Sequence, residues 1–177
     1  GATLLERATG LLRSLLDDVW VSVRTDPLRM PVRSAYPLIS DQLQNRGPAA
    51  GILAAHLHTP NAAWLVVACD LPLLDADTLR LLIDGRDNSL DATALAVSAA
   101  ADPEPLCAIW EPATLAGLAA AARQSGNGPP GPSVSPRSLL AAADPLLLNP
   151  ARPGALSSVN TPADLHRYLE HTHGHKP

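Results

Sequence analysis

Hydrophobic and polar positions in the first third of the chain follow helical and strand patterns in turn. Between residues 4 and 16, apolar side chains recur every three or four positions, which predicts an amphipathic helix. Residues 19–23 form a β-branched run typical of a strand, and residues 36–39 form a weaker strand candidate because it contains a proline. A second helix is predicted from Gly47 to about His58, with proline at its first position.

The same alternation continues to the end of the chain. Strands are predicted at the apolar runs 63–69, 92–99 and 106–110. Further helices are predicted at 78–83, 114–123 and 138–143, and from residue 161 onward. Residues 125–136 are rich in Gly, Pro and Ser, which predicts a flexible surface loop. Alternating strands and helices predict an α/β fold in which helices cover both faces of a mostly parallel sheet.

Composition narrows the class of protein. The length of 177 residues suits a single domain spanning residues 1–177, and a hydrophobic content of 46% is that of a globular chain. With 3% aromatics and no Phe, the core must consist mainly of Leu, Val, Ile and Ala. A net charge of −4 without a basic stripe argues against nucleic acid as a partner. Anionic substrates would therefore be held locally, by backbone amides, a few cations or a metal ion.

The cysteines and the apolar runs indicate the compartment. Cys69 and Cys107 each lie in an apolar stretch, so we expect both to be small buried hydrophobic residues. Their number and spacing do not form a disulfide framework, which favours the cytoplasm. The longest apolar runs are too short to span a bilayer, so no membrane partner is expected.

Two aspartates are candidates for substrate chemistry because each follows a predicted strand. In open α/β sheets, ligands bind beyond the carboxyl ends of the strands. Asp70 directly follows the run ending at Cys69, where a carboxylate is a natural ligand for a hard divalent cation; a turn or helix cap is the alternative. Asp41 could accept hydrogen bonds from a base or ribose, although position alone favours an ordinary loop residue.

Other polar features have structural alternatives. Gly47 and Gly51 flank the start of a predicted helix, whose backbone amides favour an anion or polar ligand. The alternative is an ordinary helix start without a ligand. Asn160 could reach the same cleft or serve as part of a helix cap. The four histidines after residue 165 indicate a polar tail rather than a metal site. The DxD sequence at residues 75–77 matches metal-dependent glycosyltransferases weakly, and capping explains it.

Five segments in order resemble the molybdenum cofactor guanylyltransferases. Residues 47–51 (GPAAG) resemble that family's GPLAG motif, and residues 68–72 (ACDLP) resemble its CDxP. Residues 104–110 (EPLCAIW) are similar to its xPLCALY strand, and residues 158–165 (SVNTPADL) to its NVNTPEDL. Residues 3–8 (TLLERA) resemble the first helix after its phosphate loop. Because these matches cover nearly the whole chain, the resemblance is specific.

The resemblance implies a Rossmann-like, three-layer α/β/α nucleotidyltransferase domain that transfers GMP from GTP to molybdopterin and releases pyrophosphate with Mg²⁺. It implies that Asp70 binds Mg²⁺ near the phosphates. It places Ser22, where the family usually has Asn, together with Asp41 and Asn160 in the nucleotide site. The glycines at 47 and 51 would line that site. Molybdoenzymes or other cofactor-biosynthesis proteins would be further partners.

One departure affects the expected activity of these 177 residues. The family opens with a central strand and the sequence LAGGxSxRMGxDK, which has no counterpart here. We therefore expect the chain as given to be inactive, to bind GTP poorly and to have a groove in the middle of its sheet. A non-catalytic relative that binds cofactor or a partner protein, a cytidylyltransferase for the same cofactor and a DxD glycosyltransferase are the alternatives.

Overall fold

The computed structural model describes residues 2–24, 35–41, 47–98, 102–124, 135–161, 163, 164 and 166. Its helices are α1 (Leu4–Arg13), α2 (Pro48–His58), α3 (Ala76–Asp84), α4 (Pro112–Gln124) and α5 (Pro136–Ala142). Its strands are β1 (Val21–Arg24), β2 (Leu38–Asp41), β3 (Trp64–Val67), β4 (Ala92–Leu95), β5 (Glu104–Trp110) and β6 (Pro145–Leu148). Most of the predicted loop and the last three histidines lie outside the described residues.

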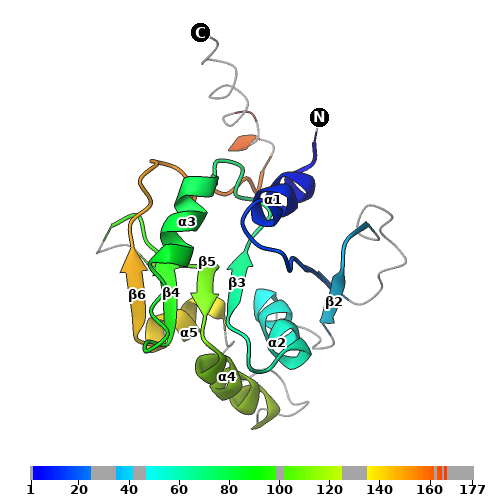
Figure 1. The fold of residues 1–177 in the computed structure, drawn as a ribbon, viewed down its shortest axis with the longest axis vertical. Helices are drawn as coiled ribbons and strands as arrows, with labels where there is room; N and C mark the ends of the chain where they lie inside the picture. Colours follow the sequence, from blue (N-terminus) through cyan, green and yellow to red (C-terminus); the bar gives the residue numbers. More distant parts are fainter. Residues whose placement is uncertain are drawn as a thin grey trace.

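The described strands form two sheets rather than one. β1 and β2 pair in parallel, and Figure 1 shows β2 apart from the strands of the second sheet, β3 to β6. The second sheet has the order β3-β5-β4-β6, in which β5 runs antiparallel to both neighbours and β4 runs parallel to β6. Within that sheet, β3, β4 and β6 therefore share one direction.

Helix α2 connects the two sheets and sets their relative direction. The Trp20 ring, just before β1, lies 4.4 Å from the ring of His58 at the end of α2. Gly51, in the first turns of α2, lies against Ser22 inside β1. Helix α2 therefore runs antiparallel to β1, and the five-residue turn that follows it starts β3 at the amino end of β1. The carboxyl ends of β1, β2 and β3 thus lie at the same end of the molecule.

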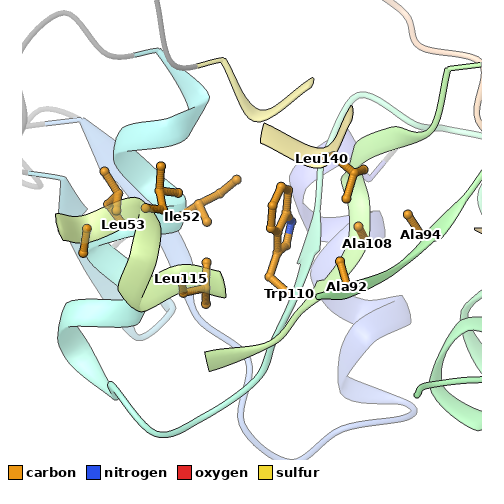
Figure 2. Close-up of a cluster of buried hydrophobic side chains, with 10 residues drawn as sticks. Ile52, Leu53, Ala92, Ala94, Ala108, Trp110, Leu115 and Leu140 are labelled. Carbon is orange, nitrogen blue, oxygen red and sulfur yellow. The ribbon is translucent and has the colours of Figure 1, made fainter. Parts of the chain in front are cut away.

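Helices cover both faces of the four-stranded sheet, so side chains alternate between two cores. On one face, residues from α2, α4 and α5 pack around Trp110 together with Ala92 and Ala108 (Figure 2). On the other face, α3 and the leucines of α1 pack against Cys107 and Ile109. Because neighbouring positions of β5 enter opposite cores, this strand is apolar at nearly every position. The predicted α/β fold with helices on both faces is confirmed.

Local sequence accounts for most helix boundaries. Thr3 and Glu6 form a reciprocal capping box at α1, and the Asp75 carboxylate caps α3 by accepting the Thr78 amide at 2.9 Å. Two expectations differ from the structure. The predicted loop extended too far, because Ser135 already caps α5. Strand β6 was not expected, since its four residues begin with proline and offer no alternation.

Candidate nucleotide site

A cavity of about 950 Å³ lies between β1 and β3. Residues 17–20 and 62–63, which precede the two strands, line one end, and Arg24, Asp41 and Ala68 line the other. Helix α2 contributes one wall, and Leu12 and Leu16 contribute from the α1 side. Among the described strands, β1 pairs only with β2 and β3 only with β5, so the cavity separates two unpaired strand edges. The groove thus lies between the two sheets, where a groove within one sheet was expected.

The open edge explains an unexpected exposure pattern. All four residues of β3 are only half-buried, although its continuous apolar sequence indicated a strand covered on both faces. Helices do cover those faces, but the edge toward β1 has no neighbour. The indole N–H of Trp64, which lines the cavity, is buried without a hydrogen-bond partner in the described part of the chain. The groove therefore has an apolar middle and charged residues at both ends, Asp17 and Asp18 at one end and Arg24 and Asp41 at the other.

The end of the groove that holds Arg24 and Asp41, here named its polar end, is built by β1, β2 and the start of α2. The parallel register pairs Ser22 with Ile39 and Arg24 with Asp41, which places these four side chains on one face of the ribbon. That face meets α2 at Gly51, where an added Cβ would come 2.5 Å from the Ser22 hydroxyl oxygen. Only a residue without a side chain lets the helix lie this close to β1. Ser22, Asp41 and Gly51 thus line the same groove, and their role in binding a nucleotide stays a prediction.

The N-terminus of α2 opens into the same end of the groove. Gly47 has φ of 54°, a conformation that favours glycine, and it makes no side-chain capping bond. No acidic residue lies in the first turn of α2. The first amides of this 11-residue helix therefore carry the positive end of the helix dipole toward the groove without a side chain to neutralise it.

Asp70 and Asn160 form a second group at the same end of the sheet. Asp70 is half-buried in the turn after β3, and its carbonyl oxygen accepts a hydrogen bond from the Val159 amide at 2.9 Å. The adjacent Asn160 side chain donates to the Ser158 hydroxyl at 2.7 Å. The backbone amides of Asn160 and Thr161 donate to the Asp164 carboxylate, at 3.2 and 2.9 Å respectively. Residues 158–161 therefore form local hydrogen bonds of the capping kind and also lie beside Asp70.

The single carboxylate at Asp70 suits an ion such as magnesium, which takes most of its ligands from water and substrate, better than an ion that needs several protein ligands. The described residues contain no group of three His, Cys, Asp or Glu side chains that could hold a metal ion. Magnesium keeps several waters and commonly binds one or two carboxylates together with substrate phosphates. A single half-buried carboxylate at a strand's carboxyl end fits that mode, provided that the substrate supplies the other oxygens.

The DxD residues have structural partners. The Asp75 carboxylate caps α3 and lies 3.5 Å from the Arg152 guanidinium. Burial raises the pKa of Asp75, but the hydrogen bonds from Thr78 and Arg152 together outweigh it and leave the pKa below its ordinary value. Asp77 pairs with Arg80 at 2.9 Å on the surface of α3. Both carboxylates are thus engaged locally, as capping predicted.

The expectation that both cysteines are buried was wrong for one of them. Cys107 is buried in β5, and burial together with the charge of Glu104 raises its pKa to about 12. Cys69 is exposed, because β3 ends at Val67 and the following turn directs residue 69 outward. Because the apolar run continues past the end of β3 as far as Cys69, the sequence pattern predicted strand where the structure has a turn. His166 is also exposed, and the three later histidines lie outside the described residues.

Arg24 is the site residue that the sequence analysis missed. It ends β1, is exposed, and lines the groove beside Asp41, its register partner on β2. The predicted strand stopped at Val23, one residue short. A charged residue at the carboxyl end of a parallel strand was the available signal, since ligands bind there.

Family models and relatives identify the class of domain. The model described as the MobA-like NTP transferase domain matches residues 1–146. The chain belongs to this family. It is 29% identical over 180 residues to a probable molybdenum cofactor guanylyltransferase of Natronomonas pharaonis, with 96% of this chain and 85% of that protein covered. Membership of this family makes the chain a nucleotidyltransferase, in agreement with the resemblance.

Other matches differ in coverage. A molybdenum cofactor biosynthesis bifunctional protein of Synechocystis is 28% identical over 154 residues, which are 87% of this chain but 42% of that protein. The chain thus spans less than half of this relative. Molybdopterin-guanine dinucleotide biosynthesis protein A of Archaeoglobus fulgidus has a similar structure, with a TM-score of 0.68 and 22% identity, covering 93% of this chain and 86% of that one. A putative protein of Aquifex aeolicus gives a TM-score of 0.71 at 15% identity, covering 89% and 79%. These two structures support the fold.

None of the helices in the described part of the chain has the length and apolar character that crossing a bilayer requires.

Proposed function

We propose that this domain transfers GMP from GTP to molybdopterin cofactor in a magnesium-dependent reaction. The observation that carries the proposal is that Asp41 and the α2 N-terminus line the groove of a MobA-like fold, while Asp70 follows β3 outside the groove lining at the same end of the sheet. The relatives named molybdenum cofactor guanylyltransferase support this choice of substrates. In the reaction, a phosphate oxygen of the cofactor bonds to the α-phosphorus of GTP, and the bond to the departing pyrophosphate breaks.

The residues would divide the work between base and phosphates. Asp70 would hold Mg²⁺, which neutralises phosphate charge when bound. The Val159 amide fixes the Asp70 backbone and so orients its carboxylate. Asp41, Ser22 and the glycines of the α2 start would hold the guanosine part, with polar acceptors and close backbone approach. Asn160, beside Asp70, would donate hydrogen bonds at the phosphate end.

The test uses the full-length gene product and follows pyrophosphate release and dinucleotide formation. Asp70→Ala should lower turnover at saturating Mg²⁺ by roughly 100-fold or more, since it removes an electrostatic contact to the transition state. The fold should survive, because the hydrogen bond from Val159 goes to the backbone of residue 70. Asp77→Ala is the matched control, because it removes an exposed carboxylate whose ion-pair partner among the described residues is Arg80.

Base choice completes the test. GTP should compete successfully against CTP and ATP at equal concentration. Preferred use of CTP would instead assign the domain to cytidylyl transfer. Turnover of Asp70→Ala within a few-fold of wild type would remove Asp70 from the metal role, and loss of activity in Asp77→Ala alone would favour DxD chemistry.

A further inference from the structure

Residues 149–160, here called the strap, cross the carboxyl ends of the four-stranded sheet. The strap leaves β6, the edge strand farthest from β3, and returns to the turn after β3, where the Val159 amide donates to the Asp70 carbonyl oxygen at 2.9 Å (Figure 1). On the way it passes the start of α3, where the Arg152 guanidinium lies 3.5 Å from the Asp75 carboxylate. The groove lies on the β1 side of β3, so the strap approaches Asp70 from the opposite side.

The strap holds Arg152 firmly by its backbone and loosely by its side chain. The Arg152 carbonyl oxygen accepts from the amide of Ala155, which is fully buried, and Gly154 makes the turn with φ of 78°. The other ion pairs between described residues are 2.7–3.0 Å long, so the 3.5 Å pair with Asp75 is the longest of them. Half of the Arg152 side chain is exposed, and its guanidinium can therefore turn to a ligand.

The proposed reaction needs a cation on the strap side of Asp70. In phosphoryl transfer the attacking and leaving oxygens lie roughly in line across the phosphorus. With GTP in the groove, the phosphate of the cofactor then approaches from the strap. Its negative charge repels both the phosphates of GTP and the Asp70 carboxylate. Arg152 is the one charged residue in the strap, all of which the structure describes.

An exposed apolar side chain lies on the same side of Asp70. Val97 follows β4, which runs in the same direction as β3, and the Ala96 amide donates to the Leu148 carbonyl oxygen at the start of the strap. Val97 is 64% exposed, more than any other large hydrophobic residue in the described part of the chain. Ligand sites combine apolar side chains with a few polar groups, so this surface suits a ring system that carries an anionic group.

We propose that the strap side binds the acceptor: Arg152 exchanges Asp75 for the phosphate of the cofactor, and Val97 contacts the ring system. The inference rests on the proposed function and assigns the side from which the acceptor reaches Asp70. A guanidinium can donate two parallel hydrogen bonds to a phosphate, which makes the phosphate a better partner than one carboxylate oxygen at 3.5 Å. Asp75 keeps the hydrogen bond from the Thr78 amide and continues to cap α3.

The experiment measures two affinities of the full-length gene product by calorimetry. The first is for molybdopterin cofactor without GTP, under anaerobic conditions, and the second is for GTP with Mg²⁺. Arg152→Ala should weaken cofactor binding roughly tenfold, the order expected for the loss of a charge-assisted hydrogen bond, and leave GTP binding unchanged. Arg152→Lys should recover part of the affinity, because lysine keeps the charge but not the fork. Val97→Ser should weaken cofactor binding a few-fold.

The variant Asp75→Asn separates ligand binding from support of α3. Asparagine can still accept the hydrogen bond from the Thr78 amide, but it removes the charge that competes for Arg152. Cofactor binding should therefore stay the same or become tighter. If Arg152 acted only by holding Asp75 in place, Asp75→Asn would weaken cofactor binding as Arg152→Ala does, and that result would overturn the inference.

Arg80→Ala is the matched control, because Arg80 is a similarly exposed arginine that pairs with Asp77 on α3. It should leave both affinities unchanged, and thermal melts show that each variant remains folded. Unchanged cofactor binding in Arg152→Ala, a common loss for GTP and cofactor, or no cofactor binding by wild type would each overturn the inference. A wild type that binds cofactor through Arg152 but forms no dinucleotide with GTP would refute the proposed function alone.

Discussion

The close approach of α2 to β1 can be tested by giving Gly51 a side chain. In an ordinary exposed helical position, Gly→Ala stabilises a protein by roughly 0.5–1 kcal/mol, because alanine loses less backbone entropy on folding. At Gly51 the new Cβ would lie 2.5 Å from the Ser22 hydroxyl oxygen and 3.3 Å from the Ser22 Cβ. Rotation of the hydroxyl can relieve the first contact but not the second.

The expected size follows from these two contacts. Crowding by one methyl group in a packed region costs about 1–3 kcal/mol. Set against the helix-propensity gain, Gly51→Ala should lower the free energy of unfolding by about 1 kcal/mol. Gly117→Ala in α4 is the matched control, because no atom lies within 4 Å of its added Cβ. That variant should raise the free energy of unfolding by roughly 0.5–1 kcal/mol.

Urea denaturation followed by circular dichroism measures both variants under one set of conditions. Ser22→Ala combined with Gly51→Ala should recover part of the loss, since the hydroxyl contact is gone. Equal stabilisation by Gly51→Ala and Gly117→Ala would refute the close packing of α2 against β1. It would also remove the reason for expecting Ser22 at the polar end of the groove.

Two further predictions concern Asp75 and the cysteines. Asp75→Ala should cost about 1 kcal/mol at neutral pH by removing the α3 cap. Folding lowers the pKa of Asp75, so its stabilisation is complete above the ordinary pKa of 3.8 and is lost as the pH falls through the lower folded-state pKa. Urea titrations from pH 7 to 2 measure the difference in unfolding free energy between wild type and Asp75→Ala. A difference that stays constant over this range would contradict the prediction. A thiol reagent such as Ellman's should label exposed Cys69 within minutes and buried Cys107, with its pKa of about 12, only on unfolding. Rapid labelling of a Cys69→Ser variant would show that β5 is more accessible than described.

Sequence patterns predicted the elements whose ends carry strong local signals. Helix α2 begins at the Pro48 that predicted its first turn and ends at His58, as its apolar pattern predicted. Asp75 caps α3 as expected. The α/β class followed from alternating strands and helices. Strand β6 escaped because four residues beginning with proline resemble an ordinary loop. The end of β3 was misplaced because apolar residues continue into the turn, which is also why Cys69 was expected to be buried.

The site could be predicted only in part, because its geometry depends on distant segments. Asp70 and Asp41 were recognisable as carboxylates near strand ends, although β2 runs two residues past the predicted strand and includes Asp41. The pairing of Arg24 with Asp41 depends on the register of two short parallel strands, which neither strand encodes alone. The contact between Gly51 and Ser22 likewise depends on how α2 packs, and a glycine in a helix start has several explanations in sequence. These features required the three-dimensional structure.

The division of the sheet also has a mechanical consequence. The β1–β2 ribbon is joined to the larger sheet through α2 and through contacts of α1, where the Arg13 guanidinium lies 4.9 Å from the centre of the Tyr36 ring. No strand-to-strand hydrogen bond between described residues crosses the groove. Backbone amides of β1 and β2 should therefore exchange with solvent through local openings that leave β4 and β5 intact. A ligand that contacts both Asp41 and Asp70 would stabilise the β1–β2 ribbon against the four-stranded sheet. Slower amide exchange in β1 would then indicate that the ligand has bound.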